Sequence, residues 1–183
     1  MTKTDGDSNA LLLLPDAYGL VQPGLYRSAT PSSDHIPFLQ NLRLRTVLLL
    51  APETLSRAVL NFLQEEDIKL VHLGLSAWKP ENTWKPCSEE LIKEGLQLLL
   101  DADQAPVLVA CSSGVNETGM LVGCLRRLQH WSLGSVLSEY RIMSGIKARY
   151  ANEQFIELFD LDLVSYPQNL TEWFIQDRAM LVG

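Results

Sequence analysis

The sequence predicts an α/β fold with a central, mostly parallel sheet flanked by helices. Short runs rich in Val and Leu, without polar alternation, recur at residues 46–51, 68–73 and 106–110. Stretches with apolar residues at helical spacing lie between them, at 55–63 and 91–100. Strands that are buried on both faces and alternate with helices are typical of parallel sheets covered by helices. In such folds ligands bind at the carboxyl ends of strands.

Length and composition indicate one compact domain. The chain has 183 residues, of which 46% are hydrophobic and 20% charged. Its formal net charge is −7, and residues 151–183 hold six acids and only one base. Nucleic-acid binding is therefore not expected, because it depends on clustered Lys and Arg that neutralise phosphates.

The cysteines and the N-terminus argue against a zinc-binding, secreted or membrane-spanning protein. Cys87, Cys111 and Cys124 cannot all pair with one another, and their spacing fits no zinc site. The leucine run at 11–14 ends at Pro15, which is too short for a membrane span, and no signal-peptide pattern precedes it. We expect a cytoplasmic protein with no metal, no cofactor and no membrane segment.

The first part of the chain predicts a strand and loop at 18–31, which is rich in aromatic and turn residues. Asp34 is a plausible N-cap for a short helix after this loop. Residues 74–86 contain two Pro and two Trp without periodicity, which predicts a long loop. Loops of this length are often functional. Its tryptophans, Trp78 and Trp84, either contact a protein partner or pack over a pocket.

The later part predicts helices at 118–129, 137–143 and around 155–159. The remaining tail, 164–183, has apolar anchors such as Phe174 separated by acids. Such a segment either docks on its own domain or binds a partner.

The turn between the strand at 106–110 and the helix from 118 is the expected site. It reads CSSGVNETG. Small residues that lead into a helix N-terminus form a nest of backbone N–H groups that binds phosphate. A cysteine at its mouth stands where a nucleophile would. An ordinary strand-to-helix turn that begins with a small buried cysteine is the alternative.

Four segments of the sequence resemble the plant and fungal atypical dual-specificity phosphatases. They are GLYRSATP, FLQNLRLRTVLLLAPE, PVLVACSSGVNETGMLVGCLRRLQHWSL and LSEYRIMSGIKARYANEQFIELFD. This family is a branch of the cysteine phosphatases whose active members cleave phosphotyrosine surrogates and inositol pyrophosphates. The resemblance implies the dual-specificity (cysteine) phosphatase fold. It implies a phosphatase-like domain at 11–163, followed by an acidic, aromatic extension at 164–183. The first ten residues are polar, and we expect them to be a disordered N-terminus at 1–10.

The resemblance also locates departures from the active pattern, which is His-Cys-five residues-Arg. Cys111 and Gly114 match that pattern, but the histidine position holds Ala110 and the arginine position holds Glu117. The vestigial phosphate loop then consists of Cys111, Ser112, Ser113, Gly114, Val115, Asn116 and Glu117. No residue of the loop is cationic. We expect Cys111 to be a vestigial nucleophile that behaves as an ordinary thiol.

Three other side chains have two interpretations each. Glu81 is the only candidate general acid in the long loop, which has no Asp, and it is also a plausible solvated charge. Glu117 either caps the loop by accepting backbone N–H bonds or points to solvent. Arg27 either supports the loop from behind or forms a buried ion pair.

We interpret the chain as a pseudophosphatase that acts as a non-catalytic interaction subunit or scaffold. Fungal members of the family associate with paralogous members, so the resemblance implies protein partners, and a hetero-oligomer with paralogous phosphatase-family subunits. The alternative is a weakly active or phosphate-ligand-binding tyrosine/dual-specificity or inositol pyrophosphate phosphatase.

Overall fold

The computed structural model describes residues 12–77 and 85–182. Within these ranges one sheet is built from β1 (Gly19–Gln22), β2 (Leu25–Ala29), β3 (Thr46–Leu49), β4 (Lys69–His72) and β5 (Val107–Cys111). Their order across the sheet is β1-β2-β5-β3-β4, and every neighbouring pair is parallel except β1 and β2. The expected mostly parallel sheet is confirmed.

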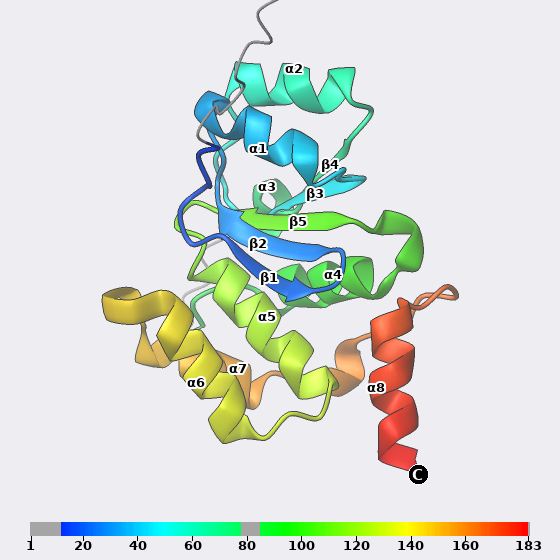
Figure 1. The fold of residues 1–183 in the computed structure, drawn as a ribbon. Coiled ribbons are helices and arrows are strands. Elements are labelled where there is room, and N and C mark those ends of the chain that lie inside the picture. Colours follow the sequence, from blue (N-terminus) through cyan, green and yellow to red (C-terminus); the bar gives the residue numbers. More distant parts are fainter. Residues whose placement is uncertain (1–11, 78–84, 183) are drawn as a thin grey trace, which may run out of the picture.

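Helices cover both faces of this sheet (Figure 1). They are α1 (Ile36–Asn41), α2 (Arg57–Glu65), α3 (Gly74–Ala77), α4 (Glu89–Leu100), α5 (Glu117–Leu128), α6 (Leu133–Ser144), α7 (Tyr150–Leu158) and α8 (Glu172–Val182). Helices α1 and α2 lie on one face, and α4 and α5 lie on the other, with α6 and α7 outside α5. No helix among the described residues is long and apolar enough to cross a membrane.

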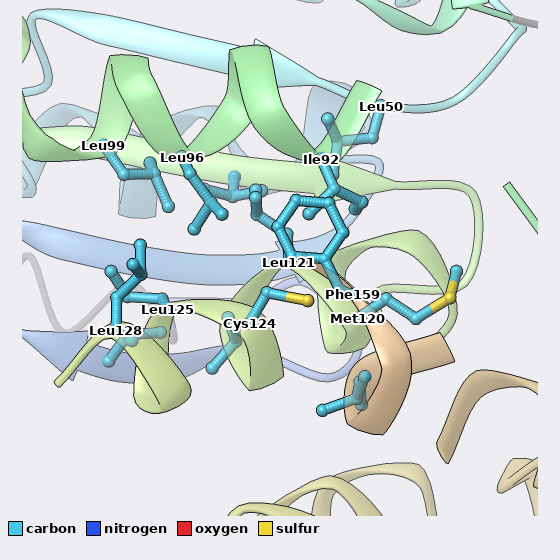
Figure 2. Packing of buried hydrophobic residues seen from close by; sticks show 14 of the residues in the cluster. Leu50, Ile92, Leu96, Leu99, Met120, Leu121, Cys124, Leu125, Leu128 and Phe159 are labelled. Atoms are coloured by element: carbon cyan, nitrogen blue, oxygen red, sulfur yellow. The ribbon is translucent and has the colours of Figure 1, made fainter. Parts of the chain in front are cut away.

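The continuous apolar strands divide their side chains between two cores, because successive strand residues point to opposite faces. Leu49 and Ala110 pack with the residues of α1 and α2. Leu50, Val109 and Cys111 pack with those of α4 and α5. Figure 2 shows the second core, where leucines of α4 and α5 face each other beneath the sheet.

Two local expectations are corrected. Asp34 is not a helix N-cap; Ser32 takes that position before a short 3₁₀ turn, and its backbone N–H donates to Nδ1 of His35 at 2.9 Å. The segment expected to be a loop from residue 74 begins with the helical turn α3. This turn starts against the sheet, since a Cβ on Gly74 would lie 2.1 Å from the carbonyl oxygen of Ala51.

The strand expected within 18–31 is a hairpin of two strands. Pro23 and Gly24 interrupt the run, and Gly24 adopts a φ of 75° that favours glycine. The hairpin places β2 beside β5, so the chain segment around Ala29 borders the loop that follows Cys111.

The C-terminal tail docks on its own domain. The side chain of Phe174 is fully buried in the core beneath the sheet. Backbone hydrogen bonds join Thr171 to Leu100 at 3.0 Å and Ala102 to Asn169 at 2.9 Å. Helix α8 nevertheless keeps apolar side chains exposed, Met180 among them.

Candidate functional site

The predicted loop lies at the carboxyl edge of the sheet, directly after β5. Cys111 ends this central strand, and α5 begins at Glu117. The carbonyl oxygen of Cys111 accepts hydrogen bonds from the backbone N–H of Thr30 at 2.9 Å and of Gly114 at 3.1 Å. The turn is therefore fastened to its own strand and to the end of β2.

Gly114 and Arg27 hold the back of the loop. Gly114 has a φ of 70°, and a Cβ there would lie 2.4 Å from the backbone nitrogen of Ala29. Nη2 of Arg27 donates to the Gly114 carbonyl oxygen at 2.9 Å. Among the described residues this guanidinium forms no ion pair, so Arg27 supports the loop from behind. Burial lowers the pKa of Arg27, although the charges of Glu139 and Cys111 oppose that effect.

The carboxylate of Glu53 contacts the front of the loop, which the sequence did not lead us to predict. The hydroxyl of Ser112 donates to Oε2 of Glu53 at 2.8 Å. This hydrogen bond lowers the pKa of Glu53. Glu53 follows β3, the neighbour of β5 in the sheet. The signal was present, because the carboxyl ends of adjacent parallel strands share one edge.

The remaining polar side chains of the loop bond to one another and to helices behind it. The Ser113 hydroxyl accepts from Nδ2 of Asn116 at 3.3 Å. Oδ1 of Asn116 accepts from Nδ2 of Asn152 at 3.2 Å, and the same amide donates to the Tyr140 hydroxyl at 2.9 Å. The loop is thus connected to α7 and α6.

The two positions that decide the chemistry lie on opposite sides of Cys111. Ala110 is fully buried and faces the core under α1 and α2. Glu117 is half-buried, and within the described ranges no backbone N–H donates to its carboxylate. The pKa of the Cys87 thiol is raised, mainly because the thiol is buried. Electrostatic repulsion from Cys124 and Glu117 raises it further. Cys111 itself has an exposed fraction of 0%.

Other expected features have separate outcomes. Glu81, Trp78 and Trp84 lie outside the described residues. All three cysteines are free thiols. No group of three or more His, Cys, Asp or Glu in the described part of the chain is placed to hold a metal ion.

Comparison with known proteins identifies the family. The family model described as "Tyrosine phosphatase family" matches residues 12–177. The chain belongs to this family. Its match extends past the end of α7 and includes the first half of α8.

Some of the relatives of this chain are named as tyrosine-protein phosphatases and others as inositol diphosphatases. "Probable tyrosine-protein phosphatase DG1060" of Dictyostelium discoideum is 43% identical over 87% of this chain and 94% of its own length. "Inositol diphosphatase DSP1" of Oryza sativa subsp. japonica is 39% identical over 85% of this chain and 69% of its own length.

A solved structure gives the fold. The core catalytic domain of the PP-IP phosphatase SIW14 from S. cerevisiae, in complex with citrate, matches with a TM-score of 0.75 and 35% identity. The match covers 82% of this chain and 90% of that one. The cysteine-phosphatase fold expected from the sequence is confirmed.

Proposed function

We propose that this member of the tyrosine phosphatase family is a pseudophosphatase, which acts in the cytoplasm as a non-catalytic interaction subunit or scaffold for paralogous phosphatase-family proteins. One observation carries the proposal. Glu117 stands at the sixth position after Cys111, where the active pattern of the family has arginine. That arginine binds phosphoryl oxygens with two planar hydrogen bonds and stabilises charge in the transition state.

The size of the electrostatic change argues against a merely slow enzyme. Two unit charges about 4 Å apart interact by roughly 4 kcal/mol at an effective dielectric near 20. Exchanging an attractive guanidinium for a repulsive carboxylate therefore costs a singly charged oxygen roughly 8 kcal/mol. A cost of this size corresponds to about six orders of magnitude in rate.

The surroundings of Cys111 support the same proposal. A nucleophile must reach its substrate, and Cys111 has no exposed surface. The hydroxyl of Ser112 is engaged by Glu53, which brings a second carboxylate to the loop. Two acids beside the loop disfavour an anionic ligand, so this arrangement speaks against the alternative of a phosphate-binding protein.

The proposal also accounts for what the loop retains. Gly114 keeps its left-handed conformation, and the buried Arg27 remains bonded to it. These contacts stabilise the fold whether or not the loop binds phosphate. The three free thiols fit a reducing compartment such as the cytoplasm.

Two measurements on the purified chain test the proposal. Calorimetric titration with inorganic phosphate and an inositol polyphosphate should show no binding, which separates the proposal from an anion-binding protein. Sedimentation of the chain mixed with an active paralogue of the same organism should show a complex. Phosphate binding, or absence of a complex with every paralogue, would contradict the respective part of the proposal.

A further inference from the structure

One edge of the sheet has no further strand beside it among the described residues. β4 is the outermost strand of the order β1-β2-β5-β3-β4 (Figure 1). Its residues are half-buried or exposed, whereas every residue of its neighbour β3 is buried. An uncovered edge strand presents a row of N–H and C=O groups to which another extended chain can bind.

The hydrogen bonds of β4 show which of its backbone groups point outward. The backbone N–H of Lys69 donates to the Arg45 carbonyl oxygen at 2.9 Å, and that of Leu73 donates to the end of β3 at 3.0 Å. The N–H and C=O of one strand residue point to the same side, and successive residues alternate. Leu70 and His72 therefore direct both groups away from β3, and no described residue outside the sheet bonds to their backbone.

The opposite edge of the sheet is protected. The pairing of β1 is irregular around Val21, and the Val21 carbonyl oxygen accepts a hydrogen bond from Nη2 of Arg126 at 3.0 Å. Irregular pairing, covering groups and edge lysines are the usual means by which proteins prevent strand addition. β4 carries one such lysine, Lys69, but its ammonium donates to Oε1 of Gln104 at 3.2 Å, which holds it toward residues 102–104. β4 is thus the edge that is open to addition.

A groove with a volume of about 570 Å³ lies beside this edge on the α4 side. Its apolar lining includes Val71 of β4, Leu98 of α4 and the ring of Tyr166, which is 47% exposed. Alternate side chains of a strand point to the same face. An added strand would therefore place every second side chain in this groove, and those side chains should be apolar.

The charges at one end of the groove select the ends of such a strand. Glu66 and Asp67 form the turn that leads into β4, and both are exposed. Neither forms an ion pair with a described residue. Asp101 adds a carboxylate to the lining, where Lys69 is the only base among the described residues. Basic side chains are complementary to this end.

We propose that β4 is the docking edge for an extended, apolar segment of a partner protein, which adds to the five-stranded sheet as a further strand. The segment runs antiparallel to β4, the more stable pairing, and its basic C-terminal end lies beside Glu66 and Asp67. Hydrogen bonds to the backbone of Leu70 and His72 supply affinity, and the groove selects alternate apolar side chains. The inference does not rest on the loss of catalysis.

A synthetic peptide of alternating valine and threonine that ends in two lysines is the probe. In antiparallel pairing the threonines lie opposite Leu70 and His72, and the valines enter the groove. Amide hydrogen exchange of the full chain, followed by NMR, should slow about tenfold or more at Leu70 and His72 when the peptide is added. Exchange at Lys69 and Leu73, whose amides are already bonded to β3, should not change.

A matched peptide and a pair of variants are the controls. The same peptide with proline in place of each threonine should not bind, because it lacks the N–H groups that face β4. Val71→Lys, which brings a charge into the groove, should weaken binding of the first peptide about tenfold or more. Leu20→Lys should leave binding unchanged, since Leu20 is 65% exposed on β1 at the opposite edge.

Four results would overturn the proposal. They are unchanged exchange at Leu70 and His72 with the peptide, equal binding of the proline peptide, equal binding to Val71→Lys, and slow exchange of these two amides in the free chain. The last result would mean that another segment or a second copy already covers the edge. The phosphate loop takes no part in these measurements, so their failure is distinguishable from a failure of the proposed function.

Discussion

Nη2 of Arg27 donates a 2.9 Å hydrogen bond to the carbonyl oxygen of Gly114. Arg27 is only 3% exposed, and it lies behind the loop on β2. Its hydrogen bond goes to the backbone of the loop rather than to a ligand at the mouth. The contact therefore preserves the shape of a phosphate loop in a chain that has no cation within that loop.

Removing this guanidinium should destabilise the fold. Arg27→Met is expected to lower the free energy of unfolding by about 1–3 kcal/mol, because the Gly114 carbonyl loses its buried side-chain partner. Urea denaturation measures the change. The exposed Arg57→Met should leave stability within about 0.5 kcal/mol of the parent. Equal stability of the two variants would contradict the structural role of Arg27.

Two glycines should respond to alanine in opposite directions. Gly114→Ala is expected to cost about 1–3 kcal/mol, since it combines a positive φ with a close backbone contact. Gly134→Ala, in α6 with open space around it, should stabilise by about 0.5–1 kcal/mol. Urea midpoints at low protein concentration compare the two. A Gly114→Ala variant as stable as the parent would show that the loop adopts another conformation.

The ion pair between Arg141 and Glu153 should give a pH-dependent contribution. Nε of Arg141 donates to Oε1 of Glu153 at 2.8 Å, and the Arg141 hydrogen bond lowers the pKa of Glu153. A lowered pKa stabilises the fold above the ordinary glutamate range, about 4.3, and this contribution disappears as the pH falls through the folded-state pKa.

Glu153→Gln should accordingly lower the urea midpoint at pH 7, and its difference from the parent should shrink toward pH 3. Glu157→Gln, on the same helix but exposed, provides the control. A difference between Glu153→Gln and the parent that stays constant with pH would mean that the ion pair contributes nothing.

Restoring one cation should recover binding but little catalysis. Glu117→Arg is expected to bind phosphate or vanadate in a calorimeter, because the backbone of the loop is in place. Hydrolysis should stay near background, since Ala110, Ser112 and Ser113 also depart from the active pattern and members of a catalytic unit act together. Glu65→Arg, which changes the net charge equally on α2, should bind nothing. Substantial turnover by Glu117→Arg would mean that the site lacks only its arginine.

Much of the fold could be predicted from residue patterns within single helices and strands. The Val and Leu run before Ala51 predicted a strand buried on both faces, and β3 is such a strand. The hairpin could not be read from residues 18–31, because pairing depends on the positive φ of Gly24 and on β5 as a neighbour. Asp34 failed as an N-cap because Ser32, two residues earlier, already starts the turn.

The candidate site, too, could be predicted only in part from the sequence. Sequence order placed Cys111, Gly114 and Glu117 in one loop. The contacts of that loop come from distant segments, namely Glu53 after β3 and Arg27 on β2. Their side-chain directions depend on how the strands align, which a linear pattern does not contain. The sequence of the tail allowed either docking on its own domain or binding of a partner. The burial of Phe174 depends on tertiary packing, which the sequence pattern does not contain.

Turnover by the purified wild-type chain is the most direct measurement of the central claim. Phosphate release from a generic phosphate ester and from an inositol pyrophosphate should equal that of Cys111→Ser, because Glu117 stands in place of the cation that the transition state needs. Wild-type turnover above background that disappears in Cys111→Ser would contradict the account and make this chain an active phosphatase.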